Sequence, residues 1–138
     1  MCLENITPTN KALITVGYQV KGINLAGAPY SRMAGYRRPQ PIGEWLDAAD
    51  YGNSQSIHCD DFISVYQAGF HVFHRKKDAL EWTSMPLGKN SAPNYHLFKV
   101  ACRDRVAHGT QWVAASRACI KAEVSVFSSI KILREITR

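Results

Sequence analysis

The pattern of apolar and polar residues changes its period within residues 66–82. Residues 69–74 read Gly-Phe-His-Val-Phe-His and alternate as a β-strand does, with Phe70 and Val72 on one face. Residues 76–82 instead cluster their apolar side chains as a short helix does, with Ala79 and Leu80 toward the core. A strand that runs directly into a short helix predicts that helix and sheet pack together in one domain.

Four further segments alternate and predict strands, over residues 11–23, 94–102, 118–127 and 130–135. The first carries apolar residues on both faces in part, as a strand near the middle of a sheet does. The last fits either a strand or a C-terminal helix. The alternation is clearest over 118–127, where one face is entirely apolar: Ile120, Ala122, Val124 and Val126.

Segments rich in Gly, Pro, Asn and charged residues separate the strands. Residues 24–41 predict a surface loop with a short strand near 30–33, residues 84–93 a long loop, and residues 103–109 a turn. Residues 51–61 predict a polar loop.

Two short segments complete the predicted elements. Residues 62–66 fit a short strand or turn, and residues 42–49 fit one or two helical turns that place Trp45 and Leu46 on the core side. The expected fold class is therefore α+β, a single domain over residues 11–138. Its sheet is mostly antiparallel with one or two short helices packed on it, after a flexible lead-in over residues 1–10.

Composition places the chain among ordinary globular proteins. Its 138 residues include 46% hydrophobic residues and four cysteines. The cysteines form no C-x-x-C pair, and we find no secretory h-region and no apolar run long enough to cross a membrane. These features predict a cytoplasmic protein with reduced thiols, in which Cys102 and Cys119 lie buried in strands.

The net charge of +6 favours partners with acidic surfaces or nucleic acid. The charge concentrates in two places. In the first, Arg32, Tyr36, Arg37 and Arg38 interleave guanidinium groups with aromatic rings, and Trp45 follows. The second is the turn after the central strand, with Arg75 and Lys76. Arg, Tyr and Trp are enriched at interface hot spots and also stack on bases. The first loop is therefore either a binding surface or a loop whose tyrosines pack on the sheet while its arginines are solvated.

The titratable residues offer little chemistry. His71 and His74 lie three apart, but in a strand they point to opposite faces, so we expect no metal site. No nucleophile elbow, P-loop or dinucleotide-binding glycine motif is present, so we expect no cofactor. Glu123 is the glutamate that stands on a strand between two apolar residues. It is either a solvated strand residue or a catalytic carboxylate.

Short motifs in order along the chain resemble a group of small uncharacterised bacteriophage proteins. They are Met-Cys-Leu at the start, Gly-Tyr-Gln-Val at 17–20, Gly-Phe-His-Val-Phe at 69–73, Gly-Thr-Gln at 109–111 and Ile-Lys-Ile-Leu at 130–133. The resemblance implies a phage accessory protein that acts in the cytoplasm of a bacterial host. Such proteins often bind and disable host machinery, including CRISPR and other defence systems.

The segment 69–80 also looks like the strand and helix of ADP-ribosyltransferases. That resemblance implies Glu123 as the catalytic carboxylate, with Tyr18 or His71 holding NAD. Lys-Ala-Glu at 121–123 stands where that family has Glu-x-Glu or Gln-x-Glu, and no Ser-Thr-Ser follows on a second strand.

The sequence thus leads to three hypotheses. The first is a non-catalytic phage protein that binds and inhibits or modulates a host protein or protein–nucleic-acid complex with an acidic surface. Its contacts would come from the Arg32–Arg38 loop with Trp45, and from His71, Arg75 and Lys76. The alternatives are an ADP-ribosyltransferase-like enzyme or NAD-binding protein, and a basic nucleic-acid-binding protein.

Overall fold

The computed structural model of the chain describes residues 5–6, 14–30, 38–51, 56–59, 64–67, 69–83, 96–112 and 121–136. The strands are β1 (Asn5–Ile6), β2 (Val16–Ile23), β3 (Pro29–Tyr30), β4 (Trp45–Asp47), β5 (Ser56–Cys59), β6 (Ser64–Gln67), β7 (Phe70–Phe73), β8 (His96–Trp112) and β9 (Lys121–Ile136). One α-helix, α1 (Lys76–Thr83), and one 3₁₀ turn, η1 (Ala48–Tyr51), complete the described elements.

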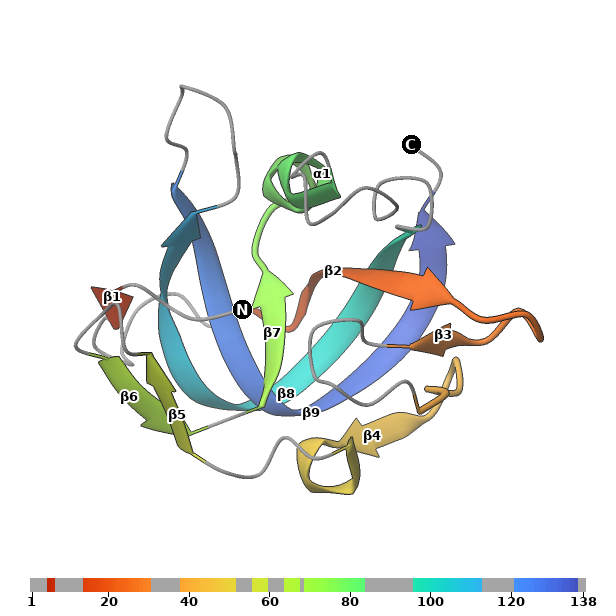
Figure 1. The fold of residues 1–138 in the computed structure, drawn as a ribbon, viewed down its shortest axis with the longest axis horizontal. Helices are drawn as coiled ribbons and strands as arrows, with labels where there is room; N and C mark the ends of the chain where they lie inside the picture. The colour runs from red at the N-terminus through yellow and green to blue at the C-terminus, as the bar shows by residue number, and fades with distance from the viewer. Residues whose placement is uncertain are drawn as a thin grey trace.

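The sheet is organised around the long hairpin of β8 and β9, which pair along nearly their whole length. β2 pairs with the first part of β8, β7 pairs with β9, and β2 and β7 meet at Tyr18 and Phe73. The four strands therefore form a closed ring of antiparallel pairings. Figure 1 shows β8 and β9 curving together through the molecule, with β7 and β2 crossing in front of them. A closed ring leaves few strand edges unpaired.

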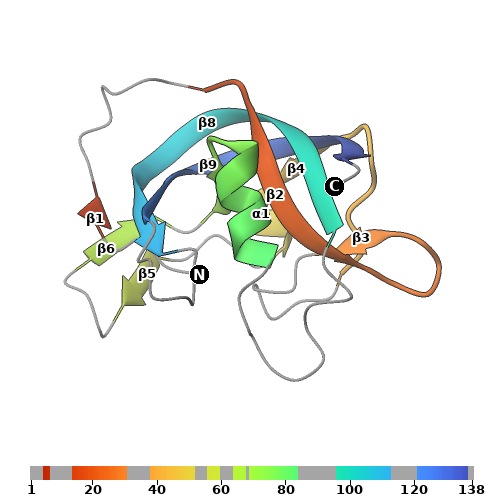
Figure 2. The same ribbon diagram turned by 90° about the horizontal axis from the view of Figure 1, so that it is seen from above.

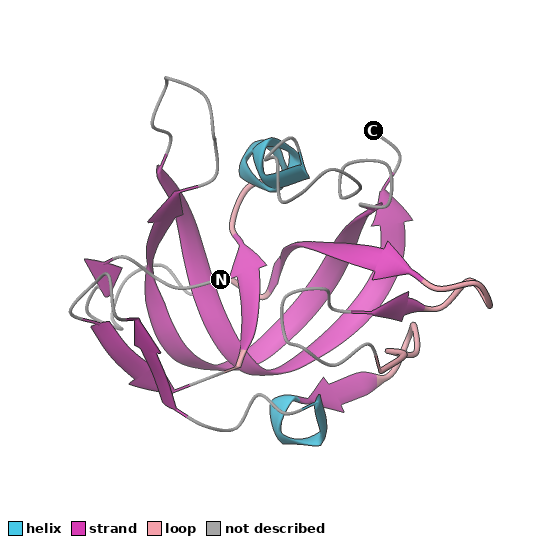
Figure 3. Cartoon of the chain, viewed as in Figure 1, coloured by secondary structure: helices cyan, strands magenta, loops and turns pink. Residues whose placement is uncertain are grey.

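Two hydrophobic cores lie on opposite faces of the curved sheet, because successive residues of a strand point to opposite sides. The α1 core consists of Phe73, Ala79, Leu97, Ala107, Ala122, Val124 and Val126. The η1 core contains Leu46, Ala48, Phe70, Val72, Phe98, Val100, Cys102, Phe127, Ile130 and Ile132. Helix α1 contributes Ala79 to the first core and lies within the curve of β8 and β9 (Figure 2). Figure 3 shows η1 on the far side of the sheet from α1.

Two glycines allow β7 to fit between its neighbours. A Cβ atom on Gly17 of β2 would lie 2.7 Å from the carbonyl oxygen of Phe73, and one on Gly69 would lie 2.6 Å from the carbonyl oxygen of Phe127. Both distances are shorter than van der Waals contact, and both involve backbone atoms that cannot rotate away. Glycine is therefore needed at both positions by close approach of backbones.

The structure confirms the coarse prediction: one small domain dominated by antiparallel sheet, with few helices. The strand–helix succession is also confirmed, as β7 (Phe70–Phe73) followed by α1 (Lys76–Thr83). Within the expected lead-in, Asn5 and Ile6 form β1 and pair with β8. The long loop expected over 84–93 lies outside the described residues.

Four expectations about local structure were wrong. The helical turns expected over 42–49 are the strand β4 followed by η1, because residues 45–47 pair with β9. Alternation along β4 buries Leu46 and leaves Trp45 41% exposed, so Trp45 does not face the core. The turn expected over 103–109 is a bulged bend inside β8, and the two strands expected over 118–135 are the single strand β9. Pairing along the whole hairpin outweighs local turn propensity.

Candidate functional site

An exposed tryptophan with two cations over its ring marks one surface of the sheet. The guanidinium carbon of Arg103 lies 4.1 Å from the centroid of the Trp45 ring, and Lys131 Nζ lies 5.9 Å from it. The ladder sets this geometry, because Trp45 on β4 is paired directly with Lys131 on β9, and β9 pairs with the part of β8 that carries Arg103. Cation–π attraction holds both cations over the indole face. We call Trp45, Arg103 and Lys131 the Trp45 cluster.

Arg38 makes a second basic and aromatic contact, on the segment of chain that follows β4. Its guanidinium carbon lies 5.0 Å from the Tyr51 ring centroid, and its Nη1 donates a 2.6 Å hydrogen bond to the carbonyl oxygen of Asp50. Both partners belong to η1, which follows β4 immediately, so Arg38 and Trp45 flank one short stretch of chain. Tyr51 in turn packs on Phe70, with 6.2 Å between ring centroids. Arg38, which the sequence placed in a surface loop, thus contacts the sheet through Tyr51.

The remaining predicted binding residues are distributed differently. Arg32, Tyr36 and Arg37 lie outside the described residues. Arg75 and Lys76 are exposed at the start of α1. Because α1 and η1 cover opposite faces of the sheet, Arg75 and Arg38 do not form one surface (Figure 1).

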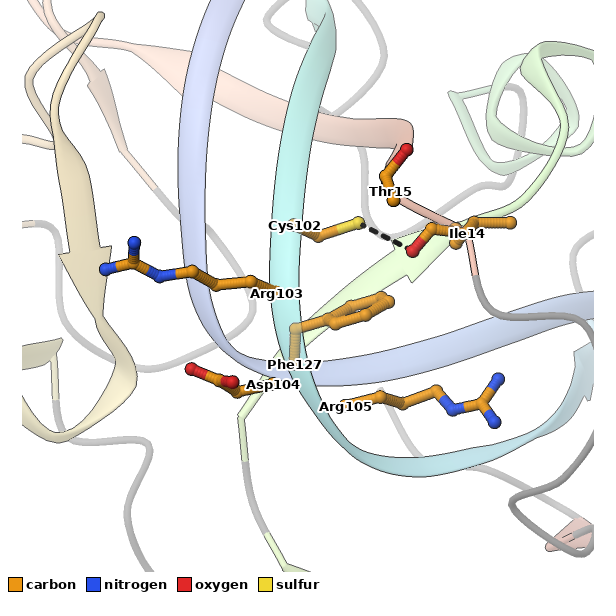
Figure 4. Close-up of a pocket in the computed structure, with 7 residues that line it drawn as sticks. All are labelled: Ile14, Thr15, Cys102, Arg103, Asp104, Arg105 and Phe127. Atoms are coloured by element: carbon orange, nitrogen blue, oxygen red, sulfur yellow. Dashed lines mark hydrogen bonds between the residues drawn. The ribbon is translucent and has the colours of Figure 1, made fainter.

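A pocket of about 410 Å³ opens beside the Trp45 cluster, where β8 bends. Its floor is apolar, formed by Phe127, Cys102 and Ile14, and Thr15 stands at its edge. Arg103, Asp104 and Arg105 supply the charges (Figure 4). Asp104 has a positive φ of 62°, a conformation uncommon for residues other than glycine, and the hairpin register shifts two residues further on.

The cysteine in the pocket floor is a neutral thiol. Cys102 is 5% exposed, and its thiol donates to the carbonyl oxygen of Ile14 at a distance of 3.8 Å. Burial raises the pKa of the Cys102 thiol to about 12, because the thiolate would be poorly solvated there. The predicted burial of this cysteine is confirmed, and it acts as an apolar part of the pocket. Cys119 lies outside the described residues.

The residues that the transferase resemblance would bring together lie on different faces. His71 pairs with Val126, and Val126 belongs to the α1 core, against which Tyr18 also packs. Glu123 precedes Val124, another α1-core residue, and so points to the opposite face. Burial lowers the pKa of the half-buried His71 to about 3, so its imidazole is neutral. Tyr18, His71 and Glu123 therefore line no common cleft.

Glu123 instead belongs to a polar cluster that the sequence did not reveal. Ser125 Oγ lies 2.6 Å from His74 Nε2 and 2.8 Å from His108 Nδ1, and Glu123 Oε2 lies 3.7 Å from His74 Nδ1. The two imidazole centroids are 5.0 Å apart. One proton arrangement satisfies both hydrogen bonds and turns the Nδ1–H of a neutral His74 toward the Glu123 carboxylate: His108 donates to Ser125, and Ser125 donates to His74.

Ser125, His74 and Glu123 follow one another as the serine, histidine and carboxylate of a catalytic triad do. Unlike the serine of such a triad, however, Ser125 cannot be reached by a substrate. Ser125 is 0% exposed and sits in mid-strand, paired with Val72 on one side and His108 on the other. A nucleophile must reach its substrate and needs nearby backbone N–H groups free for an oxyanion. Here both neighbouring strands occupy the flanks of Ser125. The cluster is a buried hydrogen-bond network that joins β7, β8 and β9.

Sequence reasoning missed Arg103, Arg105, Lys131, Ser125 and His108. For Arg103 and Arg105, the feature of the sequence that could have indicated them is the run Arg-Asp-Arg within a segment otherwise rich in apolar residues. Lys131 and Ser125 carry no local signal, because only the register of β9 brings them to their partners.

Comparison with known proteins adds no family to this description. The chain matches no protein-family model, no curated protein and no solved structure. Among the described residues, no group of three or more His, Cys, Asp or Glu side chains is placed to hold a metal ion. No helix in the described ranges has the length and hydrophobicity needed to span a membrane.

Proposed function

We propose that the protein is a non-catalytic binding protein that engages an acidic macromolecule through the Trp45 cluster and Arg38. The observation that carries the proposal is the exposed Trp45 ring with Arg103 and Lys131 both within 6 Å of its centroid. Tryptophan and arginine dominate interface hot spots, because each offers a large contact area and the guanidinium also pairs with carboxylates in two-point fashion.

Charge supports an acidic partner. Arg103 and Lys131 carry two positive charges over the Trp45 ring, Arg38 carries a third at η1, and Arg105 lies two residues from Arg103 along β8. Complementary charge raises the rate of encounter and selects against basic partners. The net charge of +6 over the whole chain acts in the same direction.

The setting we propose comes from the sequence resemblance. A small α+β protein that resembles bacteriophage accessory proteins would act in the cytoplasm of a bacterial host. Its binding would inhibit or modulate a host protein or protein–nucleic-acid complex, including components of defence systems. Non-catalytic inhibition needs only a stable contact surface, and the Trp45 cluster offers one.

Charge reversal tests the proposal. The double variant Arg103→Glu, Lys131→Glu changes the Trp45 cluster, and Lys76→Glu, Lys77→Glu makes the same charge change at exposed positions on α1. We expect a partner recovered from bacterial lysate by wild type and by the α1 variant. The cluster variant should recover at least tenfold less, with unchanged circular dichroism.

Equal recovery by both double variants would contradict the proposal. The composition of the recovered material separates it from the nucleic-acid alternative. A nucleic acid whose affinity falls steeply with salt, in proportion to the phosphates contacted, would support that alternative instead.

A further inference from the structure

The pocket beside the Trp45 cluster combines an apolar floor with a charged rim. Phe127 is 1% exposed and Cys102 is 5% exposed, so each presents only a small surface to the pocket. Ile14 adds aliphatic atoms from the segment that leads into β2. The volume of about 410 Å³ lies within the range of about 300–1,000 Å³ usual for ligand pockets. The floor therefore suits an apolar group of modest size.

The rim favours negative charge around that group. Two arginines and one aspartate line it, which leaves a net charge of +1. Figure 4 shows the guanidinium groups of Arg103 and Arg105 directed to opposite sides, with Phe127, Cys102 and Ile14 between them in this view. A ligand whose apolar group enters the pocket would thus meet a rim with a net positive charge.

The backbone at the rim is held in an uncommon conformation. Asp104 has a positive φ of 62°, a conformation that residues with a side chain seldom adopt. The bulged bend interrupts regular alternation between Arg103 and Ala107. Such bends redirect side chains, and here they set the directions of the two arginines.

Arg103 links the pocket to the proposed binding surface, because it both lines the pocket and stacks on Trp45. A partner segment that contacts the Trp45 cluster therefore reaches the pocket without further movement.

We infer that the pocket takes one apolar side chain, aromatic or branched aliphatic, from an acidic segment of a protein partner whose flanking carboxylates pair with Arg103 and Arg105. This inference rests on the proposed function, and it adds the chemistry of the partner. It distinguishes an anchored peptide from a purely electrostatic contact, in which the apolar group would contribute nothing.

Fluorescein-labelled peptides of sequence Asp-Glu-X-Glu-Asp, with X set to Phe, Leu, Trp or Ser, test the inference by fluorescence anisotropy. We expect the best apolar peptide to bind at least tenfold more tightly than the Ser peptide. The variant Thr15→Trp places an indole at the pocket edge, and it should abolish that preference while leaving the Ser peptide unaffected. Ala26→Trp is the matched control, because Ala26 is exposed in the turn after β2.

Arg103→Glu should weaken every peptide. If the four peptides bind equally and Arg103→Glu still weakens them, the pocket inference fails and the proposed function stands. If no peptide binds above background, or if an oligothymidylate binds instead with steep salt dependence, the pocket inference and the proposed function both fail. If Thr15→Trp does not fold, the inference is tested instead by NMR, from the changes in backbone amide chemical shifts of the wild-type protein on adding the Phe peptide. Shifts at Thr15, Cys102 and Arg105 support the inference, and their absence overturns it.

Discussion

Lys21 lies in the middle of β2 with only 2% of its surface exposed, and its Nζ donates a 2.5 Å hydrogen bond to Gln40 Oε1. Gln40 is itself buried and is held by a backbone hydrogen bond to Pro29. Burial lowers the pKa of Lys21 from 10.5 to about 7, because an ammonium is poorly solvated there. At the residue scale, this lysine and His74 in the cluster around Ser125 both have a lowered pKa, so each makes stability depend on pH.

The lowered pKa of Lys21 predicts that stability rises with pH above 7. Between pH 7 and 10.5 the unfolded chain holds a proton that the folded protein has released, so raising the pH favours the folded state. We expect Lys21 to contribute a gain of about 1.4 kcal/mol per pH unit from pH 7.5 to 9. Urea unfolding gives the free energy of unfolding of wild type and of Lys21→Met at each pH in this range. The contribution of Lys21 is the difference between the slopes of the two free energies against pH.

Above pH 8.5 the raised pKa of Cys102 makes stability fall as the pH rises. Because Cys102 is present in both wild type and Lys21→Met, this effect cancels when the two are compared. Lys76→Met, at an exposed site, serves as the control and should keep the wild-type slope. Equal slopes for wild type and Lys21→Met would contradict this account.

His74 predicts a loss of stability in mild acid. Its pKa is lowered by burial and by the neighbouring His108, while Glu123 opposes the shift. Arg105 and Arg75 also lower it. As the pH falls below about 6.5, the unfolded chain takes up the proton first, so stability decreases until the folded His74 also titrates.

We expect His74→Gln, which keeps a hydrogen-bonding group near Ser125, to make the stability profile between pH 5 and 7 less steep, leaving the part that comes from the lowered pKa of His71. Ser125→Ala should cost about 2 kcal/mol at pH 7.5, because it leaves two buried imidazole nitrogens without their shared partner. Chemical unfolding at several pH values checks both. A His74→Gln profile parallel to wild type would count against the network.

At the element scale, β7 is the strand that closes the ring, and its fit depends on two glycines. It is only four residues long and pairs with both β2 and β9. The sequence predicted this strand and the helix after it correctly, since a change of period within one segment is a local property. The single strand β9 and the bent β8 were not predicted, because their continuity comes from pairing with each other.

Gly69→Ala should destabilise the protein by about 3 kcal/mol, since its Cβ would lie 2.6 Å from a backbone oxygen of β9 that cannot move without breaking the ladder. Gly27→Asn is the control. Gly27 has a positive φ of 83° but open space around it, and Asn tolerates that conformation. Thermal and urea unfolding should show a change below about 1 kcal/mol for Gly27→Asn. A similarly small change for Gly69→Ala would show that β7 can move away from β9.

At the scale of the whole molecule, the curved sheet determines which charges share a surface. Arg38 contacts η1, and Trp45 on β4 lies under Arg103 and Lys131, whereas Arg75 and Lys76 lie at the start of α1. The sequence indicated basic and aromatic residues, and Arg38 and Trp45 were among them. Arg103 and Lys131 joined the candidate surface only through the pairing of β4, β8 and β9.

The sequence by itself determined the local elements with a strong period, the globular character, the positive charge and the candidate residue types. These depend on neighbours within a few positions of the chain or on composition. Tertiary structure alone decided that Trp45 is exposed, that Glu123 and His71 point apart, and that Ser125 joins two histidines. Those outcomes depend on strand register and sheet curvature, where a shift of one residue moves a side chain to the opposite face.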